Sequence, residues 1–313
     1  MGGLKSVQVP PLLRQHLQQL LEEHISRRDA IEVCINRPGE VWIETAKGWE
    51  RKVIKGLTAQ AFHDFLSTLA TEQQQAFSDS VPFLATTIPG YDFRIQGVGG
   101  AVAAEGVCIA IRCGRAQRFP IEPYFSDQGA ARRLIELVKR GGNILVAGPT
   151  GSGKTTFLNS LLQYIPLQLR LALVEDAKEL VVDHPNHFRL LKSKSGTDIA
   201  KVTWEQIVDA LMRLRPDGIL FSEIDIRNTV VFLLLMNTGH KYCFATIHAN
   251  EGANQAIKRM VLNAQLGGLS GGPELVREYA TQELDAVVFV KKEEIPGQGR
   301  KYSATVEFLE DMR

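Results

Sequence analysis

Residues 148–155, Gly-Pro-Thr-Gly-Ser-Gly-Lys-Thr, have the residue types and spacing of a phosphate-binding loop. Glycines let the backbone curl so that its N–H groups face phosphate oxygens, and a helix that begins there adds the positive end of its dipole. We expect Lys154 to reach the β- and γ-phosphates of ATP, and the Thr155 hydroxyl to hold Mg²⁺. A merely structural glycine-rich turn is the alternative. The predicted nucleotide-binding residues here are Gly148, Thr150, Gly151, Ser152, Gly153, Lys154, Thr155 and Thr156.

Acidic side chains follow two apolar segments that are predicted to be strands. Glu175 and Asp176 follow residues 171–174, and Glu223 follows residues 218–222. In an open α/β sheet, ligands gather at the carboxyl ends of the strands, so we expect these carboxylates to orient water or Mg²⁺. Each carboxylate, taken alone, is also explained as a solvated loop acid or a helix cap. Which of Glu175 and Glu223 positions the attacking water stays open.

Two histidines follow helix or strand segments of the same half of the chain. His248 comes after the predicted strand 242–246, in reach of a phosphate or of an acidic side chain, and His240 precedes that strand. A lone histidine is more often a structural hydrogen-bonding residue than a catalyst. His184 and His187 are predicted to lie in a loop, and no cluster of His, Cys and carboxylate residues has structural-zinc spacing.

The elements that must position these residues fall into two groups. The first is predicted to be a small α+β unit with an antiparallel sheet, formed by helices 12–25 and 57–69 and strands 31–35, 40–44, 81–88, 92–98 and 107–113. The helix 12–25 is amphipathic, which suits docking on its own unit or on a membrane or another subunit. The pattern then stops between residues 114 and 124, where Pro120 and Pro123 interrupt any regular element.

The second group begins with Ser126 as the expected N-cap of a helix that runs to Lys139. Beyond it, short apolar strands alternate with helices, and Thr203 and Gln206 have capping-box spacing. This alternation predicts an α/β fold, with a mostly parallel sheet covered by helices. The predicted boundaries are an N-terminal domain at 1–114, a linker at 115–124 and an ATPase domain at 125–313.

Composition narrows the class of protein. The 313 residues include 36 basic and 35 acidic side chains, and the net charge of +1 argues against a surface built for nucleic acid. The N-terminal residues lack the apolar core of a signal peptide, and the longest apolar run, 230–236, is too short to span a bilayer. The four cysteines show no Cys-x-x-Cys spacing and are expected to be buried free thiols. We therefore expect a cytoplasmic protein.

Taken together, the motifs resemble those of the hexameric traffic ATPases of type IV secretion systems, which are close relatives of the type II secretion and type IV pilus ATPases. The resemblance covers nearly the whole chain. It rests on the phosphate-binding loop, on Val174-Glu175-Asp176-x-x-Glu179-Leu180 (aspartate box), on Leu214-Arg215-Pro216-Asp217 with Ser222-Glu223 (Walker B region), on Asn237-Thr238-Gly239-His240 with Thr246-Ile247-His248-Ala249-Asn250 (histidine box), and on Ile35-Asn36-Arg37-Pro38-Gly39-Glu40-Val41-Trp42.

This resemblance implies a RecA-like P-loop ATPase domain with a smaller α+β N-terminal domain. It implies a ring of six subunits with ATP and Mg²⁺ between the domains, inner-membrane secretion components as partners, and peripheral association with the inner membrane of a bacterium. Arg94 and Arg112 match by position the N-terminal arginines that reach the phosphates in this family. The implied catalytic residues are Lys154, Glu175, Glu223 and His248. Arg213 and Arg215 stay unassigned.

Three residues depart from the family pattern. Ser222 stands where a glycine is usual, Asp225 where an arginine is usual, and Tyr242 where another glycine is usual. An acid in place of a base near a triphosphate is expected to slow turnover or to change how subunits coordinate. The tetracysteine insert of many type II secretion ATPases is absent and the N-terminal part is short, which favours the type IV secretion branch.

The expected function is ATP hydrolysis that powers substrate translocation or pilus assembly, or both, in a type IV secretion (conjugation) system. One alternative is an ATP-dependent assembly scaffold with weak hydrolysis, which Ser222 and Asp225 keep open. The other is a nucleic-acid motor, for which the charge balance gives no support, so we expect no stable nucleic-acid binding. The cargo, DNA or effector protein, and the symmetry of the ring stay open.

Overall fold

The computed structural model describes residues 9–45, 47–54, 56–91, 93–113, 118–192, 201–269, 272–295 and 299–312. Residues 1–8 and residues 114–117, which include the start of the predicted linker, lie outside this range. The chain divides into two compact units. The first comprises Met1–Arg115, Asp176–Lys178 and Leu191–Lys201, and the second comprises Ala116–Glu175, Glu179–Leu190 and Val202–Arg313.

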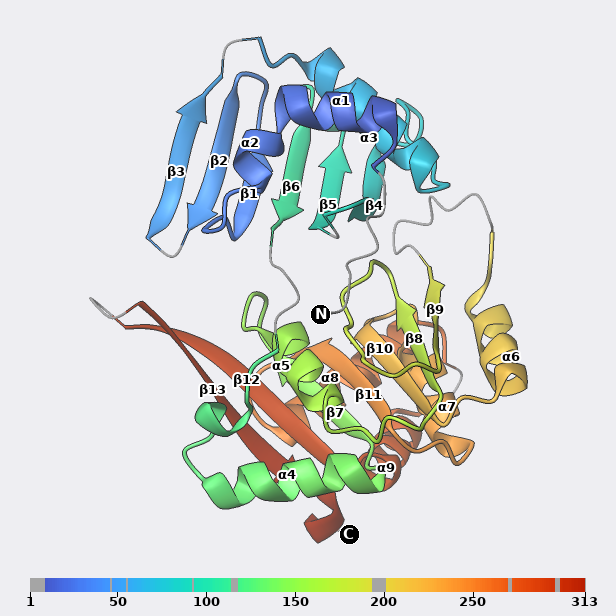
Figure 1. The fold of residues 1–313 in the computed structure, drawn as a ribbon. Helices are drawn as coiled ribbons and strands as arrows, with labels where there is room; N and C mark the ends of the chain where they lie inside the picture. Colours follow the sequence, from blue (N-terminus) through green and yellow to red (C-terminus); the bar gives the residue numbers. More distant parts are fainter. Residues whose placement is uncertain are drawn as a thin grey trace. The chain divides into compact units, whose positions relative to one another are not determined.

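The described residues of the first unit form an antiparallel sheet with helices, as the sequence predicts. The strands are hydrogen-bonded in the order β3-β2-β1-β6-β5-β4, and neighbours run antiparallel. The elements are α1 (Pro11–Leu20), α2 (Glu22–Ile25), β1 (Glu32–Ile35), β2 (Glu40–Thr45), β3 (Gly48–Val53), α3 (Ala59–Glu72), β4 (Phe83–Ile88), β5 (Phe93–Val98), the short 3₁₀ helix η1 (Gly100–Val102) and β6 (Cys108–Arg112) (Figure 1). The edge strand β3 was not predicted, because its residues are mostly exposed and show no alternation.

The helices of the first unit cover one face of its sheet. Alternate strand residues point into the core, and they meet the apolar stripes of α1 and α3. Leu17 of α1 is 1% exposed and Phe62 of α3 is completely buried. The apolar side of the predicted helix 12–25 is therefore used for docking on its own unit. That helix is interrupted at Leu21, where φ is −136°.

The described residues of the second unit form a larger, mostly parallel sheet. Its order is β13-β12-β7-β11-β10-β8-β9, in which β12, β7, β11, β10 and β8 pair in parallel and β13 pairs antiparallel with β12. The elements are η2 (Glu122–Tyr124), α4 (Gln128–Arg140), β7 (Ile144–Gly148), α5 (Lys154–Leu162), β8 (Leu171–Glu175), β9 (His187–Leu191), α6 (Trp204–Leu214), β10 (Gly218–Ile224), α7 (Thr229–Asn237), β11 (Cys243–His248), α8 (Ala253–Leu266), α9 (Pro273–Glu283), β12 (Ala286–Ile295), β13 (Gly299–Phe308) and η3 (Leu309–Met312).

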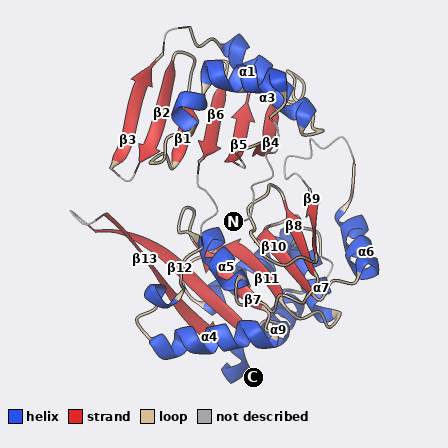
Figure 2. Ribbon diagram, in the orientation of Figure 1, coloured by secondary structure: helices blue, strands red, loops and turns tan. Residues whose placement is uncertain are grey.

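Both faces of this sheet are covered by helices (Figure 2). Ile144 and Val146 of β7 pack in one apolar cluster with α4 and α5. Leu145 and Ala147, which point the other way, pack in a second cluster with α7, α8 and α9. Burial on both faces explains the continuous apolar strands of the sequence. The carboxyl ends of the parallel strands meet at one edge, which is where the predicted site residues of this unit lie.

Details of the second unit differ from the sequence predictions. The N-cap of α4 is Asp127 and not Ser126, because the Asp127 carboxylate accepts a hydrogen bond of 2.7 Å from the Gly129 N–H. The capping box of Thr203 and Gln206 is confirmed. His187 was expected in a loop but begins β9. In the described part of the predicted linker, Ile121 is completely buried among residues of the second unit.

The cysteines are free thiols, but they are not all buried. Cys113 and Cys243 are buried, Cys34 is half-buried and Cys108 is exposed. Burial raises the pKa of Cys34, Cys113 and Cys243 to about 12. The expectation of buried thiols was wrong for Cys108, because β6 turns this residue away from the core.

The described helices are short. The longest, α3 and α8, have 14 residues each. None of the helices in the described part of the chain is long and apolar enough to cross a membrane. The apolar run 230–236 lies within α7 and packs in the core of the second unit.

Candidate active site

The phosphate-binding loop joins the buried strand β7 to helix α5. At Gly148 the chain passes so close to β12 that a Cβ would lie 2.3 Å from the carbonyl oxygen of Val290, so only glycine fits. Gly153 has φ of +88° and is the N-cap of α5. The loop therefore ends at the N-terminus of a helix, where its amides and the helix dipole favour a phosphate group.

Lys154, the first residue of α5, is held inside the loop. Lys154 is only 7% exposed, and its Nζ donates a hydrogen bond of 2.8 Å to the carbonyl oxygen of Pro149. The same Nζ lies 3.0 Å from His248 Nδ1. On the other side of the imidazole, His248 Nε2 lies 2.8 Å from Glu223 Oε1. These contacts make a hydrogen-bonded triad of Glu223, His248 and Lys154, consistent with a neutral imidazole that donates to Glu223 and accepts from Lys154.

Glu223 reaches the triad because β10 is irregular at this point. Pairing of β10 with β11 shifts register between Phe221 and Ile224, so Ser222 and Glu223 form a bulge. The Thr246 hydroxyl of β11 holds this bulge through a hydrogen bond of 2.6 Å to the carbonyl oxygen of Ser222. Bulges of this kind re-aim side chains next to active sites. The Glu223 side chain is 19% exposed, which leaves it in contact with solvent.

Glu175 has a very different environment at the end of β8. Its side chain is completely buried and forms an ion pair with Arg189 of β9. Its Oε1 accepts hydrogen bonds of 2.7 Å from the N–H groups of Glu179 and Leu180. Burial raises the pKa of Glu175, and Arg189 and the two N–H groups oppose that shift. The geometry is that of a carboxylate that holds the loop 176–180 in place.

This loop carries a further carboxylate toward the phosphate-binding loop. The Thr155 hydroxyl donates a hydrogen bond of 3.5 Å to Glu179 Oε2. Asn159 of α5 holds the loop with its side-chain amide. The amide donates a hydrogen bond to the carbonyl oxygen of Glu179 and accepts one from the Val181 N–H, both of 2.9 Å. Glu179 was not predicted as a site residue, although it stands in the aspartate-box segment. Its signal was its place as the third acid of that segment, after Glu175 and Asp176.

A hydroxyl and a carboxylate side by side are suitable oxygen ligands for Mg²⁺. The described residues contain no group of three or more His, Cys, Asp or Glu side chains that would hold a metal by themselves. Mg²⁺ in nucleotide sites commonly uses one or two protein oxygens together with phosphates and water. Thr155 and Glu179 fit that pattern.

The remaining loop residues take different positions. Thr150 and Gly151 are exposed at the tip of the loop, and Ser152 is buried. Thr156 lies in the first turn of α5, and its carbonyl oxygen accepts a hydrogen bond of 3.0 Å from Ser160. His240 lies apart from the triad in its contacts, which are to Thr238 and to the carbonyl oxygen of Leu235.

Arg94 and Arg112 lie in the first unit. They are directly opposite each other on β5 and β6, so they share one face of the sheet. Arg94 Nη2 donates a hydrogen bond of 2.6 Å to Asp176, in the short segment that groups with the first unit. Glu32 lies opposite Arg112 on β1. Burial raises the pKa of Glu32, and Arg112 opposes the rise.

The three residues that depart from the family pattern, Ser222, Asp225 and Tyr242, have different local environments. Asp225 forms an ion pair with Arg227 and accepts a hydrogen bond of 2.8 Å from the Arg227 N–H. It thereby organises the turn that leads into α7. Ser222 is buried in the bulge of β10. Tyr242 has φ of +57°, which is the left-handed region where glycine is favoured.

Comparisons with known proteins identify the family of this chain. Residues 84–271 match the family model described as "Type II/IV secretion system protein". The type IV secretion system protein PtlH of Bordetella pertussis is 30% identical over an aligned length of 319, and the match covers 91% of each chain. The crystal structure of the VirB11 ATPase from the Brucella suis type IV secretion system, in complex with sulphate, is 28% identical, covers 96% of this chain and 95% of that chain, and has a TM-score of 0.50. The pilus retraction motor PilT with bound ADP, 20% identical with 93% and 82% coverage and a TM-score of 0.63, shares the fold.

Proposed function

We propose that this chain, which belongs to the type II/IV secretion system protein family and is an ATPase of type IV secretion, hydrolyses ATP with Glu223 as the residue that positions the attacking water. The observation that carries this proposal is the triad of Glu223, His248 and Lys154 beside the phosphate-binding loop. Glu175, whose two oxygens are engaged by Arg189 and by backbone N–H groups, acts by positioning the loop that bears Glu179.

Each residue of the triad has a role that follows from its contacts. Lys154 exchanges its bonds to Pro149 and His248 for the β- and γ-phosphates when ATP binds, because phosphate oxygens carry more negative charge than a carbonyl or an imidazole. Released from Lys154, His248 keeps its contact with Glu223 and orients that carboxylate. Glu223 then accepts a hydrogen bond, and in the transition state a proton, from water. Phosphate binding by Lys154 is thus linked to the positioning of Glu223, the general base.

The nucleotide brings a divalent cation with it. Thr155 and Glu179 would hold Mg²⁺, which offsets negative charge on the β- and γ-phosphates when bound. The side chain of Thr156 and the loop amides from Thr150 to Thr155 bind the remaining phosphate oxygens.

The resemblance to the family adds two arginines of the first unit to this proposal. Arg94 and Arg112 approach the phosphates and offset the charge that develops during hydrolysis. Loss of the γ-phosphate then weakens these contacts and lets the first unit move about the predicted linker at 115–124. We propose six subunits in a ring, in the cytoplasm and peripheral to the inner membrane, with inner-membrane components of the secretion system as partners.

The site assignment is tested with Lys154→Ala. We expect ATP hydrolysis to fall by about 10²–10³-fold, because the charge on the transferred phosphoryl group loses its counter-charge. Lys139→Ala, which removes an exposed lysine of α4 that pairs with Glu136, is the matched control and should retain activity. Unchanged hydrolysis in Lys154→Ala would reject the site. Light scattering that shows only a monomer in the presence of ATP and Mg²⁺ would reject the ring.

An assembly scaffold that binds ATP and hydrolyses it slowly is the second candidate. Asp225 favours it, since this acid stands where the resemblance to the family leads us to expect an arginine, and it is paired with Arg227. A single-turnover measurement of phosphate release separates the two. Release within seconds supports a motor, whereas bound ATP that persists for many minutes supports the scaffold.

A further inference from the structure

The nucleoside end of the nucleotide must lie on one particular side of the phosphate-binding loop. In the sheet of the second unit, β11 and β10 lie on one side of β7, and β12 and β13 lie on the other. Glu223 and His248, which the proposed function assigns to the γ-phosphate end, belong to β10 and β11, and His248 contacts Lys154 of the loop. Because base, ribose and phosphates form a linear sequence, the base extends toward the β12–β13 hairpin.

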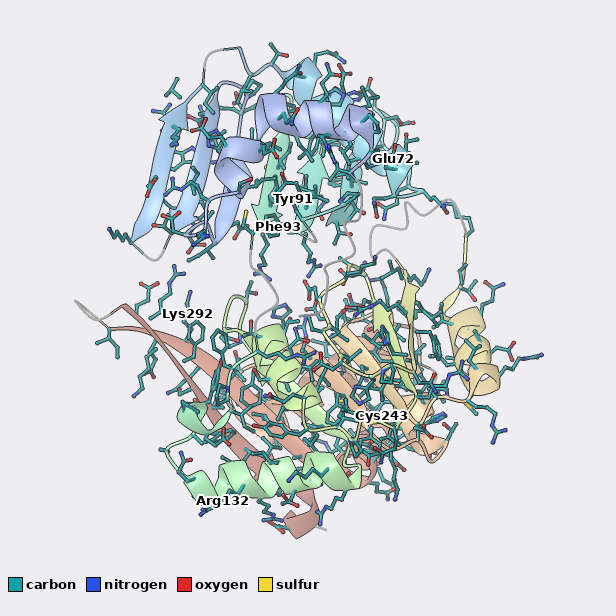
Figure 3. All side chains as sticks on the ribbon, viewed as in Figure 1. Glu72, Tyr91, Phe93, Arg132, Cys243 and Lys292 are labelled. Atoms are coloured by element: carbon teal, nitrogen blue, oxygen red, sulfur yellow. The ribbon has the colours of Figure 1, made fainter. Side chains whose placement is uncertain are left out.

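An aromatic ring already lies against the loop on that side. A Cβ at Gly153 would lie 3.3 Å from Cε1 and 3.4 Å from Cδ1 of Tyr302, so the ring of Tyr302 lies in contact with the start of α5. Tyr302 is on β13, opposite Lys292 on β12, which is labelled in Figure 3. The residue is 37% exposed, so part of the ring is accessible to a ligand.

A second tyrosine borders the same region. Tyr124 of η2 packs edge-on against Phe157 of α5, with ring centroids 5.1 Å apart. Burial raises the pKa of Tyr124, and the nearby Tyr302 hydroxyl adds to the rise. The segment before α4, the hairpin and the first turns of α5 therefore bring two tyrosines together beside the loop.

We propose that Tyr302 is the base-stacking residue of this ATPase, with the exposed part of its ring against the base of the bound nucleotide and with Tyr124 nearby. The inference rests on the proposed binding of ATP by the phosphate-binding loop. Stacking on an aromatic ring tolerates any base, since every base offers a π-face. Tyr302 therefore contributes affinity for nucleotides over bare phosphate chains, and it does not distinguish ATP from GTP.

The experiment compares two nucleotides with a bare phosphate chain on the full-length protein. Dissociation constants of ATP, of GTP and of inorganic tripolyphosphate, each with Mg²⁺, are measured for the wild type and for Tyr302→Ala, Tyr302→Phe and Lys301→Ala. We expect Tyr302→Ala to weaken ATP and GTP alike by about 10-fold, the size of one aromatic stacking contact, and to leave tripolyphosphate binding unchanged. Tyr302→Phe, which keeps the ring, and Lys301→Ala, which changes the exposed neighbour on β13, should bind ATP as the wild type does.

The outcomes separate the inference from the function on which it rests. Equal weakening of ATP and tripolyphosphate in Tyr302→Ala would mean that the ring only supports the loop, and would overturn the inference. Unchanged ATP binding in that variant would also overturn it. If the wild type bound neither ligand, the proposed function itself would fail. Steady-state kinetics add an independent check, since loss of stacking should raise KM for ATP while kcat at saturation stays the same.

Discussion

The ends of β8 and β10 carry two glutamates that look equivalent in the sequence and are not equivalent in the structure. Glu175 is completely buried, and its oxygens are bound by Arg189 and by two backbone N–H groups. Glu223 is partly exposed and contacts His248, which contacts Lys154 of the phosphate-binding loop. A carboxylate at the carboxyl edge of a parallel sheet is in the right place for catalysis, but its hydrogen-bond partners decide whether it is a base or a support.

The largest expected effect tests the end of β10. Glu223→Gln keeps the size of the side chain and removes the proton acceptor, so we expect turnover to fall by about 10²–10⁴-fold while ATP binding persists. Phosphate release after rapid mixing reports turnover, and equilibrium dialysis reports binding. Near-normal release in Glu223→Gln, together with a large loss in Glu175→Gln, would reverse the assignment of the two glutamates.

The second-largest expected effect tests the end of β8 through Arg189 of β9, which forms an ion pair with Glu175. Arg189→Met leaves the buried Glu175 without its counter-charge and should destabilise the second unit by about 3 kcal/mol. Trp204 reports unfolding of this unit if Trp42 and Trp49 of the first unit are replaced by phenylalanine. We expect the double variant Glu175→Gln with Arg189→Met to recover part of the loss, because it no longer buries a charge. A double variant less stable than Arg189→Met alone would show that the charge of Glu175 is not the source of the cost.

The bulge of β10 gives a smaller effect. Thr246→Val removes the hydroxyl that holds Ser222 O but keeps the shape of the side chain, and we expect a loss of about 1–3 kcal/mol in stability. Because Glu223 is then held less well against His248, turnover should fall by about 10-fold. Thr281→Val, which removes a hydroxyl–carbonyl bond of the same length, 2.6 Å, on α9, is the control for stability without a change in turnover. Equal turnover in Thr246→Val and Thr281→Val would show that the bulge does not contribute to catalysis.

The same comparison shows what the sequence could predict. The strand–loop–helix arrangement around residues 148–155 and the neighbouring strands were predicted correctly, since a local motif and runs of apolar residues determine them. The pairing of Glu175 with Arg189 was not predicted, because β9 is short and half-exposed and shows no periodic pattern. The bulge at Ser222 was also missed, since it depends on Thr246 of the neighbouring strand.

The β12–β13 hairpin was missed for a related reason. The buried half of β12 gives way to charged residues from Lys291 onward, so the apolar pattern ends in the middle of the strand. Tyr302 then looks like an isolated surface tyrosine in the sequence, although the fold places it against Gly153. Contacts between segments that are far apart in the chain determine both the support of Glu175 and the environment of the loop. Such contacts leave no local signal.

The smallest expected effect concerns the amino ends of the parallel strands, at the edge of the sheet opposite to the candidate site. We expect a substitution there to change stability and not turnover. Tyr242 precedes the amino end of β11 with φ of +57°, where a side chain is strained, and its hydroxyl donates a hydrogen bond of 3.0 Å to the Lys139 carbonyl oxygen. Tyr242→Gly and Tyr242→Ala both remove the ring, but only glycine removes the strain. We therefore expect the glycine variant to be more stable than the alanine variant by about 1 kcal/mol, with turnover equal in the two. If the two variants differed in turnover, catalysis would depend on both edges of the sheet, and the contrast between the ends of β8 and β10 would no longer suffice to explain it.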